Sequence, residues 1–88
     1  MSEIETIGIE ILQFVAADGK RLERFLSLTG LTPATLRQAA SAPYFHRSLI
    51  VYMAQNESEL LAFAEQSGRR PDAIMRHAAD LPHGDIGA

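Results

Sequence analysis

The chain has 88 residues, of which 47% are hydrophobic and 22% are charged, and its formal net charge is −3. This length fits one domain, and this balance excludes a disordered chain, which needs low hydrophobicity and high net charge. Cysteine is absent, which excludes a disulfide framework, a thiolate zinc site and a cysteine nucleophile. The acidic balance disfavours electrostatic binding of nucleic acid by the protein as a whole.

The sequence contains no apolar run that could cross a membrane. The longest candidate, residues 48–54, falls far short of the roughly 20 residues that a membrane helix needs. The chain opens with Glu3 and Glu5, whereas a secretory signal opens with positive charge before an apolar core. We therefore expect a cytoplasmic protein of a bacterial cell that has no membrane partner.

The first segment of the chain has the residue spacing of a helix. Apolar side chains recur at three- and four-residue steps from Ile4 to Val15, which predicts an amphipathic helix over residues 3–17. Asp18 follows, and its carboxylate can cap the start of a second helix. Leu22, Phe25 and Leu26 would lie on one face of that second helix.

The turn after the second helix carries the strongest local signals. Gly30 can end that helix because glycine adopts positive φ without strain. Thr32 can cap the next helix, and Pro33 suits its first position because its missing N–H would be unpaired there anyway. These residues predict a short third helix over residues 33–41.

The second half of the chain repeats this order of helix caps, glycine ends and proline starts. Pro43 opens a fourth helix that is apolar nearly all round, so it is either central in the core or faces another chain. Asn56 and Glu59 approximate a capping box at the start of a fifth helix, which Gly68 ends. Pro71 starts a sixth helix. No strand pattern occurs, so we expect one all-α domain over residues 1–82, a compact bundle of five to six short helices, followed by a flexible tail at residues 83–88.

Matching residues recur at a fixed offset of 38 positions. The identical pairs are Ala16 and Ala54, Leu22 and Leu60, Phe25 and Phe63, Gly30 and Gly68, Pro33 and Pro71, and Ala40 and Ala78. Repeats of this length indicate stacked helical units that share one core. We therefore expect two similar three-helix halves. The alternative is coincidence, since small helical proteins reuse the same caps.

Residues 25–37 resemble a helix-turn-helix of DNA-binding proteins, with Gly30 between two short helices. The candidate nucleic-acid contacts are Lys20, Arg21, Arg24, Thr35, Arg37 and Gln38. One arginine and one glutamine on the third helix can read bases but supply little phosphate affinity. The alternative is a helix pair that turns a corner in a bundle.

Candidate residues for a partner interface lie in the second half. They are the aromatic residues Tyr44 and Tyr52, which could anchor a partner or a second copy, and the basic residues Arg69, Arg70 and Arg76. The basic residues, with the neighbouring His77, could bind an anion or an acidic partner. The alternative is an ordinary solvated helix end.

No residue pattern indicates catalysis. His46, His77 and His83 have no metal-ligand spacing, and we expect each at the surface or at its boundary. The serines lie in no nucleophile-elbow context, and no glycine-rich phosphate loop occurs. We therefore expect no enzyme, no metal and no cofactor.

Several stretches carry a family resemblance. They are residues 21–31 (RLERFLSLTGL), residues 36–40 (LRQAA), Pro43, residues 60–64 (LLAFA), Gly68 and Pro71. In these residues the chain resembles a family of small bacterial proteins of unknown function, over nearly its whole length. Gly19 departs from the family pattern, where a proline would be typical, and this bears on helix capping only. The resemblance implies an all-α fold and no assigned activity.

Two function hypotheses follow. The leading one is a non-enzymatic protein-interaction or regulatory module, which would bind a protein partner or form a homodimer. The alternative is a helix-turn-helix DNA-binding protein, which the net charge disfavours.

Overall fold

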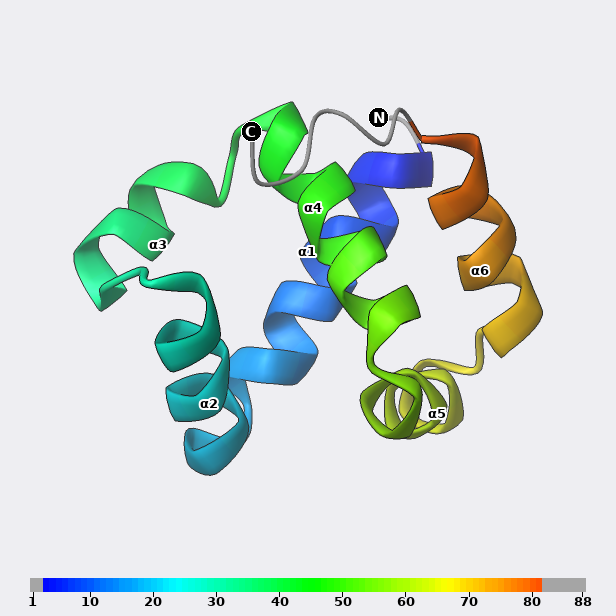
Figure 1. The fold of residues 1–88 in the computed structure, drawn as a ribbon, viewed down its shortest axis with the longest axis horizontal. Coiled ribbons are helices and arrows are strands. Elements are labelled where there is room, and N and C mark those ends of the chain that lie inside the picture. The colour runs from blue at the N-terminus through cyan, green and yellow to red at the C-terminus, as the bar shows by residue number, and fades with distance from the viewer. Residues whose placement is uncertain (1–2, 82–88) are drawn as a thin grey trace.

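The computed structural model describes residues 3–81, which form six α-helices and no strand. In chain order the helices are α1 (Glu3–Ala16), α2 (Gly19–Thr29), α3 (Pro33–Ala39), α4 (Pro43–Gln55), α5 (Glu57–Ser67) and α6 (Pro71–Asp80). The predicted all-α bundle is therefore confirmed (Figure 1). The predicted tail at residues 83–88 lies outside the described residues.

Local capping sets the helix starts in the first half. The Asp18 carboxylate accepts hydrogen bonds from the backbone N–H groups of Lys20 and Arg21, at 3.0 and 3.1 Å. Thr32 and Thr35 form a reciprocal capping box at the start of α3. These side chains satisfy N–H groups that have no partner inside the helix, which explains why α2 and α3 begin at the predicted places.

Glycines and prolines set the remaining boundaries. Gly30 and Gly68 end α2 and α5 in the left-handed conformation, at φ 76° and 77°. Ala42, which precedes Pro43, is extended at φ −82° and ψ 131° because proline disfavours helical backbone in the residue before it. As a result, α3 ends at Ala39, two residues short of its predicted end.

The predicted capping box of Asn56 and Glu59 is wrong. Asn56 is at once the last cap of α4 and the first cap of α5, and its side-chain amide donates to the Tyr52 carbonyl of α4 at 2.6 Å. The Glu59 carboxylate instead accepts from Nε of Arg21 at 2.8 Å. A charged donor from another helix therefore replaces the local backbone partner.

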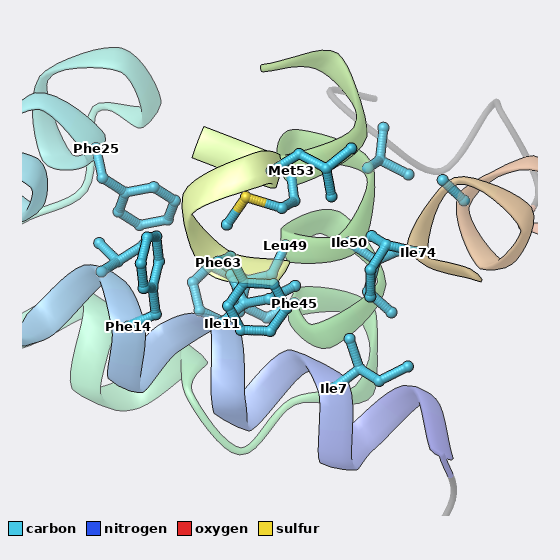
Figure 2. Packing of buried hydrophobic residues seen from close by; sticks show 14 of the residues in the cluster. Ile7, Ile11, Phe14, Phe25, Phe45, Leu49, Ile50, Met53, Phe63 and Ile74 are labelled. Atoms are coloured by element: carbon cyan, nitrogen blue, oxygen red, sulfur yellow. The ribbon is translucent and has the colours of Figure 1, made fainter. Parts of the chain in front are cut away.

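The core lies where α1 and α4 cross (Figures 1 and 2). α4 packs against α1, α5 and α6, and it is the central helix of the described structure. Its buried residues are Phe45, His46, Leu49, Ile50, Val51 and Met53. Of the two interpretations of this apolar helix, the structure supports the core one.

The crossing of α1 and α4 depends on Gly8. A Cβ atom at Gly8 would lie 2.6 Å from Cβ and 2.8 Å from Cα of His46, so only glycine permits this approach. His46 is 2% exposed, and its Nε2 donates to the Ala40 carbonyl at 2.7 Å. The prediction that His46 lies at the surface or its boundary is wrong, because the bare backbone of α1 closes over it.

The helix bounds recur at the predicted offset. α5 starts and ends 38 residues after α2, and α6 starts 38 residues after α3. Two contacts also join positions separated by 38 residues, namely Gly8 with His46 and Arg21 with Glu59. Equivalent residues therefore meet where the two halves touch. Whether this offset is a true repeat or a coincidence of reused caps stays a prediction.

Candidate interaction surface

The segment of residues 19–39, here named the α2–α3 arm, lies at one side of the molecule (Figure 1). α2 packs against α1, whereas α3 packs extensively against no other described helix. The arm is anchored by Phe25 of α2 and Leu36 of α3, which are 1% and 9% exposed. The Phe25 ring meets the rings of Tyr52 and Phe45 edge-on, at centroid distances of 5.2 and 6.4 Å. Most of the arm's remaining surface faces solvent.

One face of α2 carries two cations and an exposed leucine. Lys20, Arg24 and Leu28 follow one another at four-residue steps, so they form a ridge along the helix, here named the basic ridge. Leu28 is 61% exposed. Within residues 3–81, no carboxylate pairs with Lys20 or Arg24. The ridge is therefore a surface of unbalanced charge beside an unburied apolar side chain.

The α3 residues predicted to contact nucleic acid are all at the surface. Thr35, Arg37 and Gln38 are exposed, and no carboxylate of the described residues pairs with Arg37. The Thr35 hydroxyl, however, is engaged in the capping box with Thr32. Arg37 and Gln38 are therefore the α3 side chains that remain able to contact a partner.

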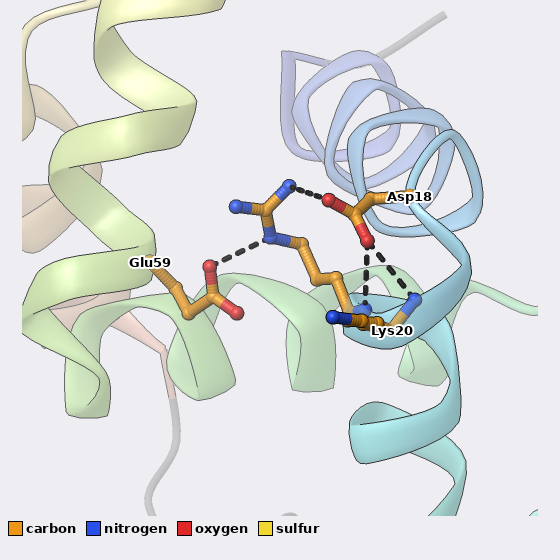
Figure 3. Close-up of polar contacts among 4 residues, drawn as sticks. Asp18, Lys20 and Glu59 are labelled. Carbon is orange, nitrogen blue, oxygen red and sulfur yellow. Dashed lines mark hydrogen bonds and ion pairs between the residues drawn. The ribbon is translucent and has the colours of Figure 1, made fainter.

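Arg21 differs from the other candidate contacts because it points inward. Its Nε donates to Glu59, and its guanidinium lies 4.1 Å from the centroid of the Phe14 ring. Its Nη1 also lies 3.7 Å from the Asp18 carboxylate (Figure 3). Arg21 thereby joins α2 to α5 and α1, which makes it part of the fold's internal bonding.

Arg69 from the second half also points to an internal partner. Its Nε and Nη2 donate to the two Glu10 carboxylate oxygens, at 2.7 and 3.0 Å. This hydrogen-bonded pair holds the pKa of Glu10 below its ordinary value and raises the pKa of Arg69. The bidentate geometry ties the start of α6 to α1.

The other cations of the C-terminal basic cluster have internal partners as well. Arg70 and Arg76 reach the Asp72 carboxylate at 3.0 and 3.9 Å, and the hydrogen bond from Arg70 lowers the pKa of Asp72. Nε2 of His77 lies 2.6 Å from the Glu3 carboxylate. The cluster is thus balanced by carboxylates of the same molecule, unlike Lys20, Arg24 and Arg37 of the α2–α3 arm.

The two tyrosines have different surroundings. Tyr44, in the first turn of α4, is 57% exposed. Tyr52 is partly buried and packs against Phe25, and burial raises the pKa of its hydroxyl, with Glu59 adding to the rise. Tyr52 therefore holds the arm against α4, and Tyr44 alone of the two is available to a partner.

Charge is segregated along the chain in a way that residue totals hide. Residues 19–56 contain five basic residues and one acidic residue, namely Lys20, Arg21, Arg24, Arg37 and Arg47 against Glu23. Residues 1–18 contain four acidic residues and no basic one. A running charge count would have indicated the arm from the sequence. Leu28 also falls outside the apolar stripe of α2, which is the signal that it faces water.

Two further observations limit the site chemistry. Within residues 3–81, no helix is long and apolar enough to cross a membrane. The same residues hold no cluster of three or more histidine, aspartate or glutamate side chains that could bind a metal ion.

Comparison with known proteins concerns the family and the fold. No curated protein and no solved structure gives a significant match to the chain. The family model described as "Protein of unknown function (DUF3572)" matches residues 2–84, which is nearly the whole chain. The predicted resemblance to a family of unknown function is therefore confirmed, and the chain belongs to the family Protein of unknown function (DUF3572).

Proposed function

We propose that the protein is a non-enzymatic protein-interaction module whose α2–α3 arm binds a partner with an acidic surface. One observation carries this proposal: three cations of the arm, Lys20, Arg24 and Arg37, have no carboxylate partner in the described residues, whereas those of the C-terminal basic cluster do. The protein as a whole is acidic, with 11 acidic and 8 basic residues. A local basic face on such a molecule orients an approaching acidic partner towards the arm.

Fold stability does not explain the basic ridge. Like charges four residues apart on a helix, such as Lys20 and Arg24, destabilise it by about 0.2–0.5 kcal/mol. An exposed leucine such as Leu28 forgoes the roughly 1.5–3 kcal/mol that full burial would contribute. An apolar side chain within a charged surround is the arrangement found in protein interfaces, so these residues fit a role in binding.

A matched pair of charge reversals tests the proposal. The double variant Lys20→Glu/Arg24→Glu removes the ridge cations, and Arg70→Glu/Arg76→Glu reverses two exposed cations of α6. Each tagged protein is purified from its own cells, and the bound proteins are quantified. We expect wild type and the α6 variant to retain the same partner and the ridge variant to lose it. Equal recovery by all three proteins would contradict the proposal.

Nucleic-acid binding is a second candidate, favoured by the turn of the arm. Gly30 at φ 76° and the cap on Thr32 place two short helices as in a helix-turn-helix, and Arg37 and Gln38 are exposed on the second helix. Seven residues make a short recognition helix, and its Thr35 hydroxyl is occupied by the cap. Because of these two features, we favour a protein over DNA as the partner of the arm.

Fluorescence anisotropy of labelled duplex DNA separates the two candidates. Binding that weakens steeply with salt and is lost in Arg37→Ala would favour DNA, since phosphate contacts release counterions. We expect flat anisotropy even at low salt, which would leave a protein as the partner of the arm.

A further inference from the structure

The exposed face of α5 carries the opposite charge to that of α2. Glu57, Leu61 and Glu65 follow one another at four-residue steps, so they form a second ridge, here named the acidic ridge. All three are exposed, and Leu61 is 51% exposed. Within the described residues, no cation pairs with Glu57 or Glu65. The acidic ridge therefore consists of an unburied leucine between two unpaired carboxylates.

The two ridges match in dimension and differ in sign. α2 and α5 are both 11 residues long, and their bounds lie 38 residues apart. Each ridge spans two helical turns and contains one leucine that is more than half exposed. Glu23 is the one carboxylate on the exposed face of α2. Equivalent helices of the two halves thus present complementary surfaces.

The two ridges do not bind each other within one molecule. The first turns of α2 and α5 are joined by the Arg21–Glu59 ion pair on their inner sides. The ridge residues lie on the faces that remain exposed after this contact has formed. The acidic ridge of one molecule can therefore contact a basic ridge only on another molecule.

We propose that the partner of the α2–α3 arm is a second copy of this chain, with the basic ridge of one copy docked on the acidic ridge of the other. This inference rests on the proposed function, because it names the partner of the same surface. The contact joins two different patches, so two copies can exchange it reciprocally in a symmetric dimer or extend it in a chain.

The spacing of the ridges allows simultaneous apolar and charged contacts. When Leu28 of one copy faces Leu61 of the other, Arg24 lies one helical turn from Leu28. A glutamate lies one turn from Leu61 on either side, so Arg24 meets Glu57 or Glu65 whichever way the helices run. The leucine contact excludes water at the centre, and this strengthens the charge pair beside it.

Charge-swap variants test this docking directly. In one variant, Lys20→Glu/Arg24→Glu makes both ridges acidic, and in the other, Glu57→Lys/Glu65→Lys makes both ridges basic. Sedimentation equilibrium is measured for wild type, for each variant and for their equimolar mixture. Arg76→Glu and Asp80→Lys are controls for charge reversal at exposed positions outside the ridges. Far-UV circular dichroism confirms that every variant is folded.

We expect wild type to self-associate, and its dissociation constant to rise with salt and by more than about tenfold in each double variant. The mixture should regain association, because each variant then meets the opposite charge at both contacts. If wild type stays monomeric, or if neither charge reversal changes the dissociation constant, the proposal that the partner is a second copy is overturned.

The purification experiment under Proposed function keeps the two proposals distinguishable. A monomeric wild type whose ridge variant loses a different acidic protein would overturn self-association alone. A monomeric wild type whose ridge variant retains every bound protein would overturn both.

Discussion

The two halves of the molecule use the same local elements and reach different degrees of packing. Each has a glycine-terminated helix followed by a proline-initiated helix, at φ 76° in one turn and 77° in the other. Yet α6 packs against α4 and buries Ile74 and Ala78, whereas α3 packs extensively against no other helix of residues 3–81 and, of its own residues, buries Leu36. Equivalent caps therefore fix where helices begin and end, and they leave open how firmly a helix is held.

Polar contacts add to the difference in how firmly α6 and α3 are held. The start of α6 is tied to α1 by the bidentate pair of Arg69 and Glu10, and its last turn by the contact of His77 with Glu3. α3 is held at its end by the hydrogen bond from His46 to the Ala40 carbonyl. The second half thus pairs its cations with carboxylates of the same molecule, while Lys20, Arg24 and Arg37 of the first half have no carboxylate partner in residues 3–81. This division is the physical basis for assigning binding of an acidic partner to the α2–α3 arm.

Truncation of the two equivalent core residues should give the largest contrast. Ile74→Ala empties a site that is 0% exposed, and we expect a loss of about 2–5 kcal/mol in the free energy of unfolding. Leu36→Ala should cost about 2 kcal/mol at most, because the site is at the edge of the core and can collapse. Urea unfolding measures both, and equal losses would contradict the different packing of α3 and α6.

Substitution of Gly8 tests the crossing at which the halves meet. The added methyl group would lie 2.6 Å from Cβ of His46, so α1 and α4 must separate. We expect Gly8→Ala to destabilise the protein by about 1–3 kcal/mol, after the roughly 1 kcal/mol gained from better helix propensity. Gly19→Ala is the control, because no atom lies within 4 Å of its added methyl group. A stabilised Gly8→Ala variant would show that α1 and α4 can accommodate the added methyl group, which would contradict the close crossing.

The two helix-ending turns should respond alike. Gly30→Ala and Gly68→Ala each place a side chain in the left-handed region, which costs roughly 1–2 kcal/mol. Neither added methyl group meets a neighbour within 4 Å, so backbone strain alone sets the loss. Thermal unfolding should show equal losses for the two variants, and a clear inequality would show that the turns differ in more than position.

The Glu10–Arg69 pair should give the smallest effect, and one that depends on pH. The pKa of Glu10 is lowered from 4.5 in the folded protein. The ion pair therefore stabilises the folded protein at pH values above 4.5. This contribution is lost as pH falls through the lowered pKa. Because both side chains are partly exposed, we expect no more than about 1 kcal/mol between wild type and Arg69→Gln at neutral pH. The difference should vanish in acid; a constant difference would mean that Arg69 acts through packing.

Local features were predictable from the sequence because each depends on a few neighbouring residues. Asp18 and Thr32 cap the helices that follow them, Gly30 ends the helix before it, and the sequence predicts all three roles. His46 could not be placed, because its burial depends on Gly8, which lies 38 residues earlier in the chain.

The same limit applies to the candidate surface. The sequence indicated the basic residues of the arm and of the second half without showing which were neutralised. Arg21 and Arg69 meet carboxylates 38 and 59 residues away, which no local pattern reveals. Arg24 and Arg37 have no such partner in residues 3–81, and only the fold separates the two groups.

Site-specific photo-crosslinking tests the central claim, that the α2–α3 arm is a binding surface and that α6, its counterpart in the second half, is not. A benzophenone side chain is placed at Leu28 of the arm or at Met75 of α6, which are 61% and 47% exposed, and cells producing each variant are irradiated. We expect a discrete crosslinked product from position 28 and none above background from position 75. Products of equal yield from both positions, or from position 75 alone, would contradict the claim.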